Sequence, residues 1–102
     1  MDLVQAARKR GLKAQMTSGN LESLKTEILG GRPVVVFLNL GLRMAPIGHF
    51  VVVTGFDDEK KGFYAHSGKE NNKFMPYKSF LKNWAKTEQT AILISPNTEP
   101  KS

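Results

Sequence analysis

The apolar run VVVFL at residues 34–38 constrains the fold of this 102-residue chain more than any other segment. It is too short and too rich in β-branched residues for a helix, and Pro33 precedes it. Continuous apolar runs of this length are typical of strands that are buried in a core. We therefore expect residues 34–38 to form a buried strand of a sheet.

A second apolar run, HFVVVTGF at residues 49–56, predicts another strand. The acidic and lysine-rich turn at residues 57–62 closes it, and the sequence FYAH follows at residues 63–66. Two strands that are joined by such a turn form a hairpin. Residues 63–66 are therefore expected to pair antiparallel with residues 49–56.

The other elements follow from periodicity and from turn residues. Asn20 is a suitable N-cap for a helix that Gly30 ends. The core side chains of that helix are expected at Leu21, Leu24, Ile28 and Leu29. Helices are expected at residues 2–10, 21–29 and 77–85, and further strands at residues 12–17, 73–76 and 90–95. This order segregates the helices from an antiparallel sheet, which defines an α+β fold.

Composition and charge remove several classes of function. The 15 Lys and Arg against 9 Asp and Glu give a net charge of +6, but the lysines are spread along the chain. The one basic cluster, residues 8–10 with Lys13, is typical of a solvated helix end, so we expect no nucleic-acid partner. No apolar run approaches the length of a membrane span, and no spanning segment is expected.

The chain contains no cysteine and only two histidines. Disulfides and thiolate chemistry are therefore excluded within these residues, although the compartment is not fixed by this absence. A zinc site would have to be built largely from carboxylates, which is uncommon. We expect no metal and no other cofactor.

His49 is the candidate catalytic residue of the chain. An ionisable ring at the first position of an apolar strand lies at the edge of the core, half dry and half wet. An imidazole in that position can act as a general base. The alternative is a core-edge histidine that caps its strand, and the sequence leaves both interpretations open.

Several segments together resemble the C-terminal part of a papain-like cysteine peptidase domain. They are ARKRGLKA at residues 7–14, residues 24–36, GHFVVVTGFD at residues 48–57, the helix at 77–84 and the strand at 91–94. The closest branch is the bacterial double-glycine, or bacteriocin-processing, peptidase family. The resemblance covers about residues 3–96 and implies a papain-like half-domain over residues 1–96, followed by a disordered tail at residues 97–102.

The resemblance implies a Cys–His–Asp arrangement in which His49 is the general base. The cysteine of the family lies on an upstream helix, which would fall before Met1. The acidic residue of the family usually lies in an Asp-Pro pair on the strand after the histidine hairpin, where this chain has His66-Ser67. His66 or Ser67 is therefore the candidate for the group that orients the ring. We expect thiol peptide hydrolysis by the complete protein and no activity from this chain alone.

The loop at residues 40–48 is expected to form one wall of a cleft for a peptide or protein substrate. Its apolar residues Leu42, Met44 and Ile47 are the candidate substrate contacts. The alternative function is a non-catalytic peptide-docking module that is associated with a transport or secretion system. The compartment stays open between the bacterial cytoplasm and the cell envelope, depending on the parent protein.

The resemblance also predicts an uncovered sheet face. A papain-like sheet packs against the cysteine-bearing helix, so apolar surface near Val51, Val53 and Phe37 is expected to be open. Exposed apolar patches of that kind favour association. We therefore expect either a homo-oligomer through this face or its coverage by residues 2–10.

Overall fold

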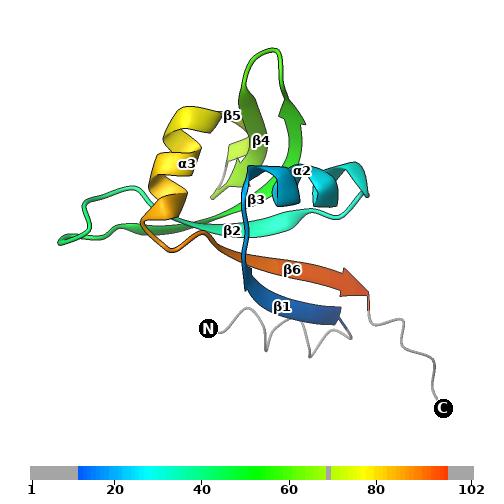
Figure 1. The fold of residues 1–102 in the computed structure, drawn as a ribbon, viewed down its shortest axis with the longest axis horizontal. Coiled ribbons are helices and arrows are strands. Elements are labelled where there is room, and N and C mark those ends of the chain that lie inside the picture. The colour runs from blue at the N-terminus through cyan, green and yellow to red at the C-terminus, as the bar shows by residue number, and fades with distance from the viewer. Residues whose placement is uncertain (1–11, 69, 97–102) are drawn as a thin grey trace.

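The computed structural model describes residues 12–68 and 70–96, whose arrangement is shown in Figure 1. Six strands of these residues form one antiparallel sheet: β1 (Leu12–Ser18), β2 (Val34–Asn39), β3 (Gly48–Asp57), β4 (Gly62–Ser67), β5 (Glu70–Pro76) and β6 (Thr90–Pro96). Two helices accompany them, α2 (Leu21–Leu29) and α3 (Tyr77–Ala85). The helix expected at residues 2–10 and the tail expected at residues 97–102 lie outside the described residues.

The strand order is β1-β6-β2-β3-β4-β5, so β2 is central and β1 lies at one edge. In β2, the side chains of Val34, Val36 and Leu38 are fully buried, whereas those of Val35 and Phe37 are half-buried. The prediction of a buried strand is confirmed, and burial is complete on one face only. The predicted α+β class with an antiparallel sheet is also confirmed.

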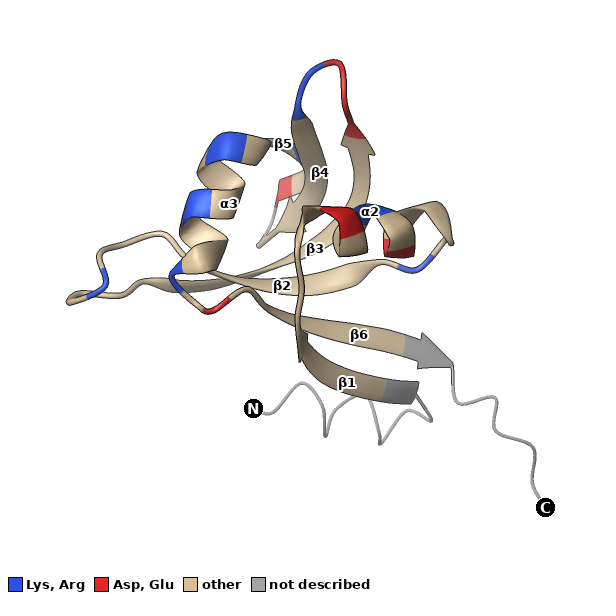
Figure 2. Ribbon diagram, in the orientation of Figure 1, with Lys and Arg blue, Asp and Glu red and all other residues tan. Residues whose placement is uncertain are grey.

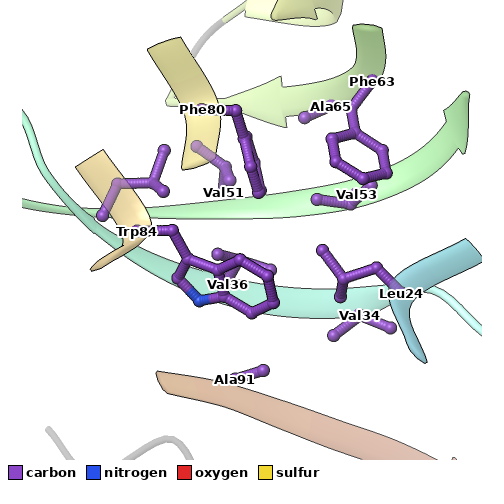
Figure 3. Close-up of a cluster of buried hydrophobic side chains, with 11 residues drawn as sticks. Leu24, Val34, Val36, Val51, Val53, Phe63, Ala65, Phe80, Trp84 and Ala91 are labelled. Carbon is purple, nitrogen blue, oxygen red and sulfur yellow. The ribbon is translucent and has the colours of Figure 1, made fainter. Parts of the chain in front are cut away.

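Both described helices cover the same face of the sheet (Figure 1). Phe80 and Trp84 of α3 and Leu24 of α2 project onto the valines of β2 and β3, as Figure 3 shows. These side chains are at most 2 % exposed. The main core therefore lies between the two helices and this face, which we call the helix face.

The helix α2 begins at its predicted N-cap. Asn20 Oδ1 accepts a hydrogen bond from Ser23 N at 2.8 Å, and Ser23 Oγ accepts one from Asn20 N at 2.8 Å. Leu24 is buried as expected, but Leu29 is 77 % exposed. The prediction of Leu29 as a core residue was wrong, because one step past Ile28 turns the side chain about 100° around the helix axis.

The open sheet face predicted at Val51 and Val53 is not present. Both side chains are buried because α2 and α3 cover the helix face. Phe37 lies on the opposite face, where its ring packs against that of Phe50 with the centroids 4.7 Å apart. The helices of the same chain thus cover the predicted association surface at both valines. Self-association itself stays a prediction.

Among the described residues, no helix combines the length and the apolar character that a membrane span needs.

Candidate functional site

His49 is the second residue of β3 and is half-buried. It pairs across the strands with Leu38 of β2, and paired residues of neighbouring strands point to the same side of a sheet. Since Leu38 is a fully buried residue of the helix face, the imidazole also lies on that face. The ring therefore occupies the edge of the core, as the sequence pattern predicts.

The pairing of β3 with β4 contains one irregularity. Gly55 pairs with Tyr64, but Val53 pairs with Ala65, so Thr54 is an extra residue in β3. This is a β-bulge, and beyond it the register of the two strands is offset by one residue. The offset decides which residue of β3 lies opposite the last residue of β4.

That last residue is Ser67, which pairs with Val51 and so lies on the same face as His49. The distance between Ser67 Oγ and His49 Nε2 is 2.5 Å. With the ring proton on Nε2, the imidazole donates to the hydroxyl, and Nδ1 keeps the lone pair that can accept a proton. Within the described residues, Nδ1 makes no hydrogen bond. The hydroxyl can also donate to an unprotonated Nε2, so the contact orients the ring without fixing which nitrogen carries the proton.

His66 lies on the other face of the sheet. It pairs with Val52, and its Nδ1 accepts a hydrogen bond from Asn72 N at 3.3 Å. Of the two candidate orienting residues, the structure therefore brings Ser67 and not His66 to the ring of His49.

The loop between β2 and β3, residues 40–47, is organised by Asn39, the last residue of β2. Asn39 is buried, and its Oδ1 accepts hydrogen bonds from Gly41 N and Ile47 N, both at 2.9 Å. Its Nδ2 donates to Leu42 O at 3.3 Å. The available signal was an asparagine directly between a buried strand and a glycine-containing loop, because such side chains often hydrogen-bond nearby backbone groups. We call residues 40–47 the apical loop.

The three candidate substrate contacts lie on the apical loop and are exposed: Leu42 by 70 %, Met44 by 98 % and Ile47 by 61 %. The loop continues the β2–β3 pair away from the level of His49. Leu42 lies four residues beyond the pairing partner of His49, which in extended chain corresponds to a separation of roughly 13 Å. The structure therefore does not gather Leu42 and Met44 around the imidazole, and Ile47 is the nearest of the three in register.

A hollow of about 470 Å³ at the base of the apical loop is separate from the histidine. Its lining includes Phe37, Thr87 and Glu88. Phe37 faces away from the helix face, so this hollow is not part of the His49–Ser67 site. Among the described residues, no three His, Asp or Glu side chains are grouped so that they could hold a metal ion.

Comparison with known proteins defines the class. The family model of the Peptidase_C39 like family matches residues 4–92, which is most of the chain. Together with the antiparallel sheet and its two helices, this match makes the chain a peptidase-like domain and confirms the resemblance to cysteine peptidases. The chain belongs to the Peptidase_C39 like family.

A solved structure shares the fold. It is a crystal structure from Bacillus anthracis, described as that of a presumed C39-like peptidase, with a TM-score of 0.69 and 22 % sequence identity. The alignment covers 88 % of this chain and 55 % of that one, so this chain spans about half the length of the Bacillus protein. No protein of curated function matches the chain.

Proposed function

We propose that His49 is the general base of a thiol-dependent peptide hydrolysis whose cysteine comes from outside these 102 residues. The observation that carries the proposal is the pair of His49 Nε2 and Ser67 Oγ at 2.5 Å on the helix face. Membership of the Peptidase_C39 like family supports the same class of chemistry. Because the chain has no cysteine, we expect it to hydrolyse no peptide by itself.

The proposed steps follow from the two ring nitrogens. His49 Nδ1 takes the proton of the thiol, and the thiolate sulfur bonds to the carbonyl carbon of the scissile peptide. The imidazolium then gives its proton to the leaving amine as the C–N bond breaks, which leaves a thioester. His49 next takes a proton from water, whose oxygen attacks the thioester and releases the acid and the thiol. Throughout, Ser67 holds the ring in one orientation.

The substrate in this proposal is a peptide. Ile47, at the base of the apical loop, is our candidate for contact with the residues near the scissile bond. Leu42 and Met44 lie further along the loop and would reach only substrate residues several positions away.

The missing cysteine permits a direct test of His49 as a base. In Ser67→Cys, the new sulfur is the only thiol of the chain and lies beside Nε2, so the variant tests whether the ring, with its own proton on Nδ1, accepts a thiol proton at Nε2. A neighbouring imidazole that accepts the proton raises the thiolate fraction, so alkylation by iodoacetamide at neutral pH should be roughly tenfold faster than in Ser67→Cys/His49→Ala.

Ser79→Cys on the exposed side of α3 gives the rate for a thiol without a nearby imidazole. The proposal predicts that this control and the double variant react at similar, slow rates. Equal alkylation of Ser67→Cys with and without His49 would show that the ring accepts no proton from a neighbouring thiol, and it would overturn the assignment.

A non-catalytic peptide-docking module of a transport or secretion system is the second candidate function. It is favoured by the neutral hydroxyl of Ser67, because a carboxylate stabilises an imidazolium better than a hydroxyl does. Binding of peptides by the chain, together with equal alkylation rates in the test above, would support this second function.

A further inference from the structure

The apical loop projects from the sheet and is closed by backbone hydrogen bonds. Leu42 and Ala45 exchange two backbone hydrogen bonds of 3.1 Å, which close a tight turn over Arg43 and Met44. Below this turn, Leu40 N donates to Ile47 O at 2.9 Å. These backbone hydrogen bonds continue the pairing of β2 with β3 and end in a turn at the tip of the loop.

Four aliphatic side chains of this loop are exposed: Leu40 by 47 %, Leu42 by 70 %, Met44 by 98 % and Ile47 by 61 %. Contiguous exposed apolar surface is unfavourable in water and marks interaction sites in folded proteins. The backbone hydrogen bonds of the loop keep these side chains in solvent, so their exposure follows from the conformation of the loop.

The body of the protein fixes the direction of the loop. Besides the bonds of buried Asn39, Lys86 Nζ at the end of α3 donates to Gly41 O at 2.7 Å and to Asn83 Oδ1 at 3.3 Å. The base of the loop and the end of α3 are thus joined directly. In Figure 1, the loop extends beyond the sheet on the side where α3 lies.

The outer face of α3 is basic. Lys78, Lys82 and Lys86 follow one another at intervals of four residues, and α3 contains no acidic residue. Phe80 and Trp84 point into the core, so the exposed Lys78 and Lys82 face away from it, whereas the half-buried Lys86 is bonded to the base of the apical loop. Figure 2 shows basic segments along α3 on the same side of the molecule as the apical loop. Arg43, in the turn at the tip of that loop, is exposed. The acidic residue nearest to α3 along the chain is Glu88, in the turn that follows the helix.

We propose that the apical loop and the outer face of α3 form a docking surface for an anionic phospholipid bilayer. Leu42 and Met44 enter the boundary between headgroups and acyl chains, and Lys78, Lys82 and Arg43 face lipid phosphates. A convex apolar tip fits a deformable apolar layer, whereas an acidic protein partner would have to supply a matching groove. This surface shares the apical loop with the proposed substrate contacts but does not include His49 or Ser67, so lipid binding can be tested separately from hydrolysis.

The test measures co-sedimentation of the full chain with vesicles of phosphatidylcholine alone and of equal parts phosphatidylcholine and phosphatidylglycerol. We expect binding to the anionic vesicles only. Leu42→Ser/Met44→Ser and Lys78→Glu/Lys82→Glu should each weaken the partition coefficient by about tenfold or more.

Matched controls separate this surface from the general effect of a +6 chain. Met16→Ser/Leu29→Ser changes two exposed apolar residues elsewhere, and Lys60→Glu/Lys61→Glu makes the same charge change in the β3–β4 turn. Both controls should bind within about twofold of the wild type. Equal losses in test and control pairs, or no binding to anionic vesicles, would overturn the proposal.

A labelled variant tests insertion without relying on the charge variants. Met44→Cys is the only thiol of its chain and can carry an environment-sensitive fluorophore. Its emission should shift to the blue on anionic vesicles, while that of labelled Leu29→Cys should not. An unshifted Met44 label, or a shift of that label caused by an acidic protein and not by lipid, would contradict insertion into a bilayer.

Discussion

A hydroxyl holds the imidazole of His49, and this choice of partner limits what the ring can do. Ser67 Oγ orients the ring through one hydrogen bond, yet it carries no charge with which to stabilise an imidazolium. In the proposed reaction, the ring would accept a proton transiently and return it. It is less suited to hold a stable thiolate–imidazolium pair than a histidine that is bonded to a carboxylate.

The tautomer is directly measurable. In Ser67→Ala, His49 loses its one described side-chain partner, so the balance of its two neutral tautomers should change. The ring nitrogen chemical shifts measured by NMR at alkaline pH should therefore differ from those of the wild type. The free energy of unfolding should change by only about 1 kcal/mol, the net value of one hydrogen bond.

Ser79→Ala on α3 serves as the control, because its hydroxyl bonds to backbone and not to a histidine. Unchanged ring shifts in Ser67→Ala would mean that Ser67 does not hydrogen-bond the ring of His49 in solution.

At the scale of elements, the turn between α3 and β6 is strained. Thr90 N donates to Thr87 O at 3.2 Å, and the two residues between them, Glu88 and Gln89, have φ of +54° and +58°. Turns of this form favour Asn-Gly, since other side chains are disfavoured at positive φ. Here the turn is held by Ser18 Oγ, which donates to Glu88 O at 2.8 Å.

Relief of this strain should stabilise the protein. We expect Gln89→Gly to raise the free energy of unfolding by about 0.5–1 kcal/mol in chemical denaturation. Gln89→Ala keeps the strained φ and should give no such gain. If the glycine variant is no more stable than the alanine variant, the backbone at residue 89 is not strained in solution.

The elements of this fold were largely predictable, whereas their relative placement was not. Periodicity located α3 at residues 77–85 and the β3–β4 hairpin, because local apolar patterns and turn residues encode both. The sequence left open whether His66 or Ser67 faces His49, because that choice depends on the bulge at Thr54, which no local signal marked. Similarly, nothing local indicated that α2 and α3 cover the same face, and so Val51 and Val53 were expected to be exposed.

For the molecule as a whole, one polar cluster joins three separate elements. Lys25 Nζ of α2 lies 2.8 Å from Asp58 Oδ1 in the β3–β4 turn, and Tyr77 OH of α3 donates to the same oxygen at 2.8 Å. The ammonium also lies 5.4 Å from the centroid of the Phe56 ring. Burial, reinforced by Asp58, raises the pKa of Tyr77 well above its usual value, so the phenol stays protonated and keeps donating.

This cluster makes stability depend on pH in a defined direction. The hydrogen bond from Lys25, followed by that from Tyr77, lowers the pKa of Asp58, and the bond to Asp58 raises the pKa of Lys25. The carboxylate therefore stabilises the fold above about pH 4, and this contribution is lost as the pH falls through the lowered pKa. The lysine contribution is lost only as the pH rises above about 10.4, through the raised pKa.

We expect wild type to be more stable than Asp58→Asn from pH 5 to pH 9, with a difference that shrinks as the pH falls below about 4. Chemical denaturation at a series of pH values measures this difference. Glu59→Gln, in the same turn, controls for the loss of one negative charge. A difference that stays constant down to acid pH would exclude Asp58 as the titrating group.

The bulge at Thr54 also bears on how relatives of this chain are aligned. A single inserted or deleted residue in β3 changes which β4 residues lie on the same face as His49, while all site residues keep their identity. Two family members with the same His-Ser dipeptide can therefore present different side chains to the histidine. A sequence alignment whose gap is misplaced by one position from the bulge will align the partner of His49 with the wrong residue of the relative.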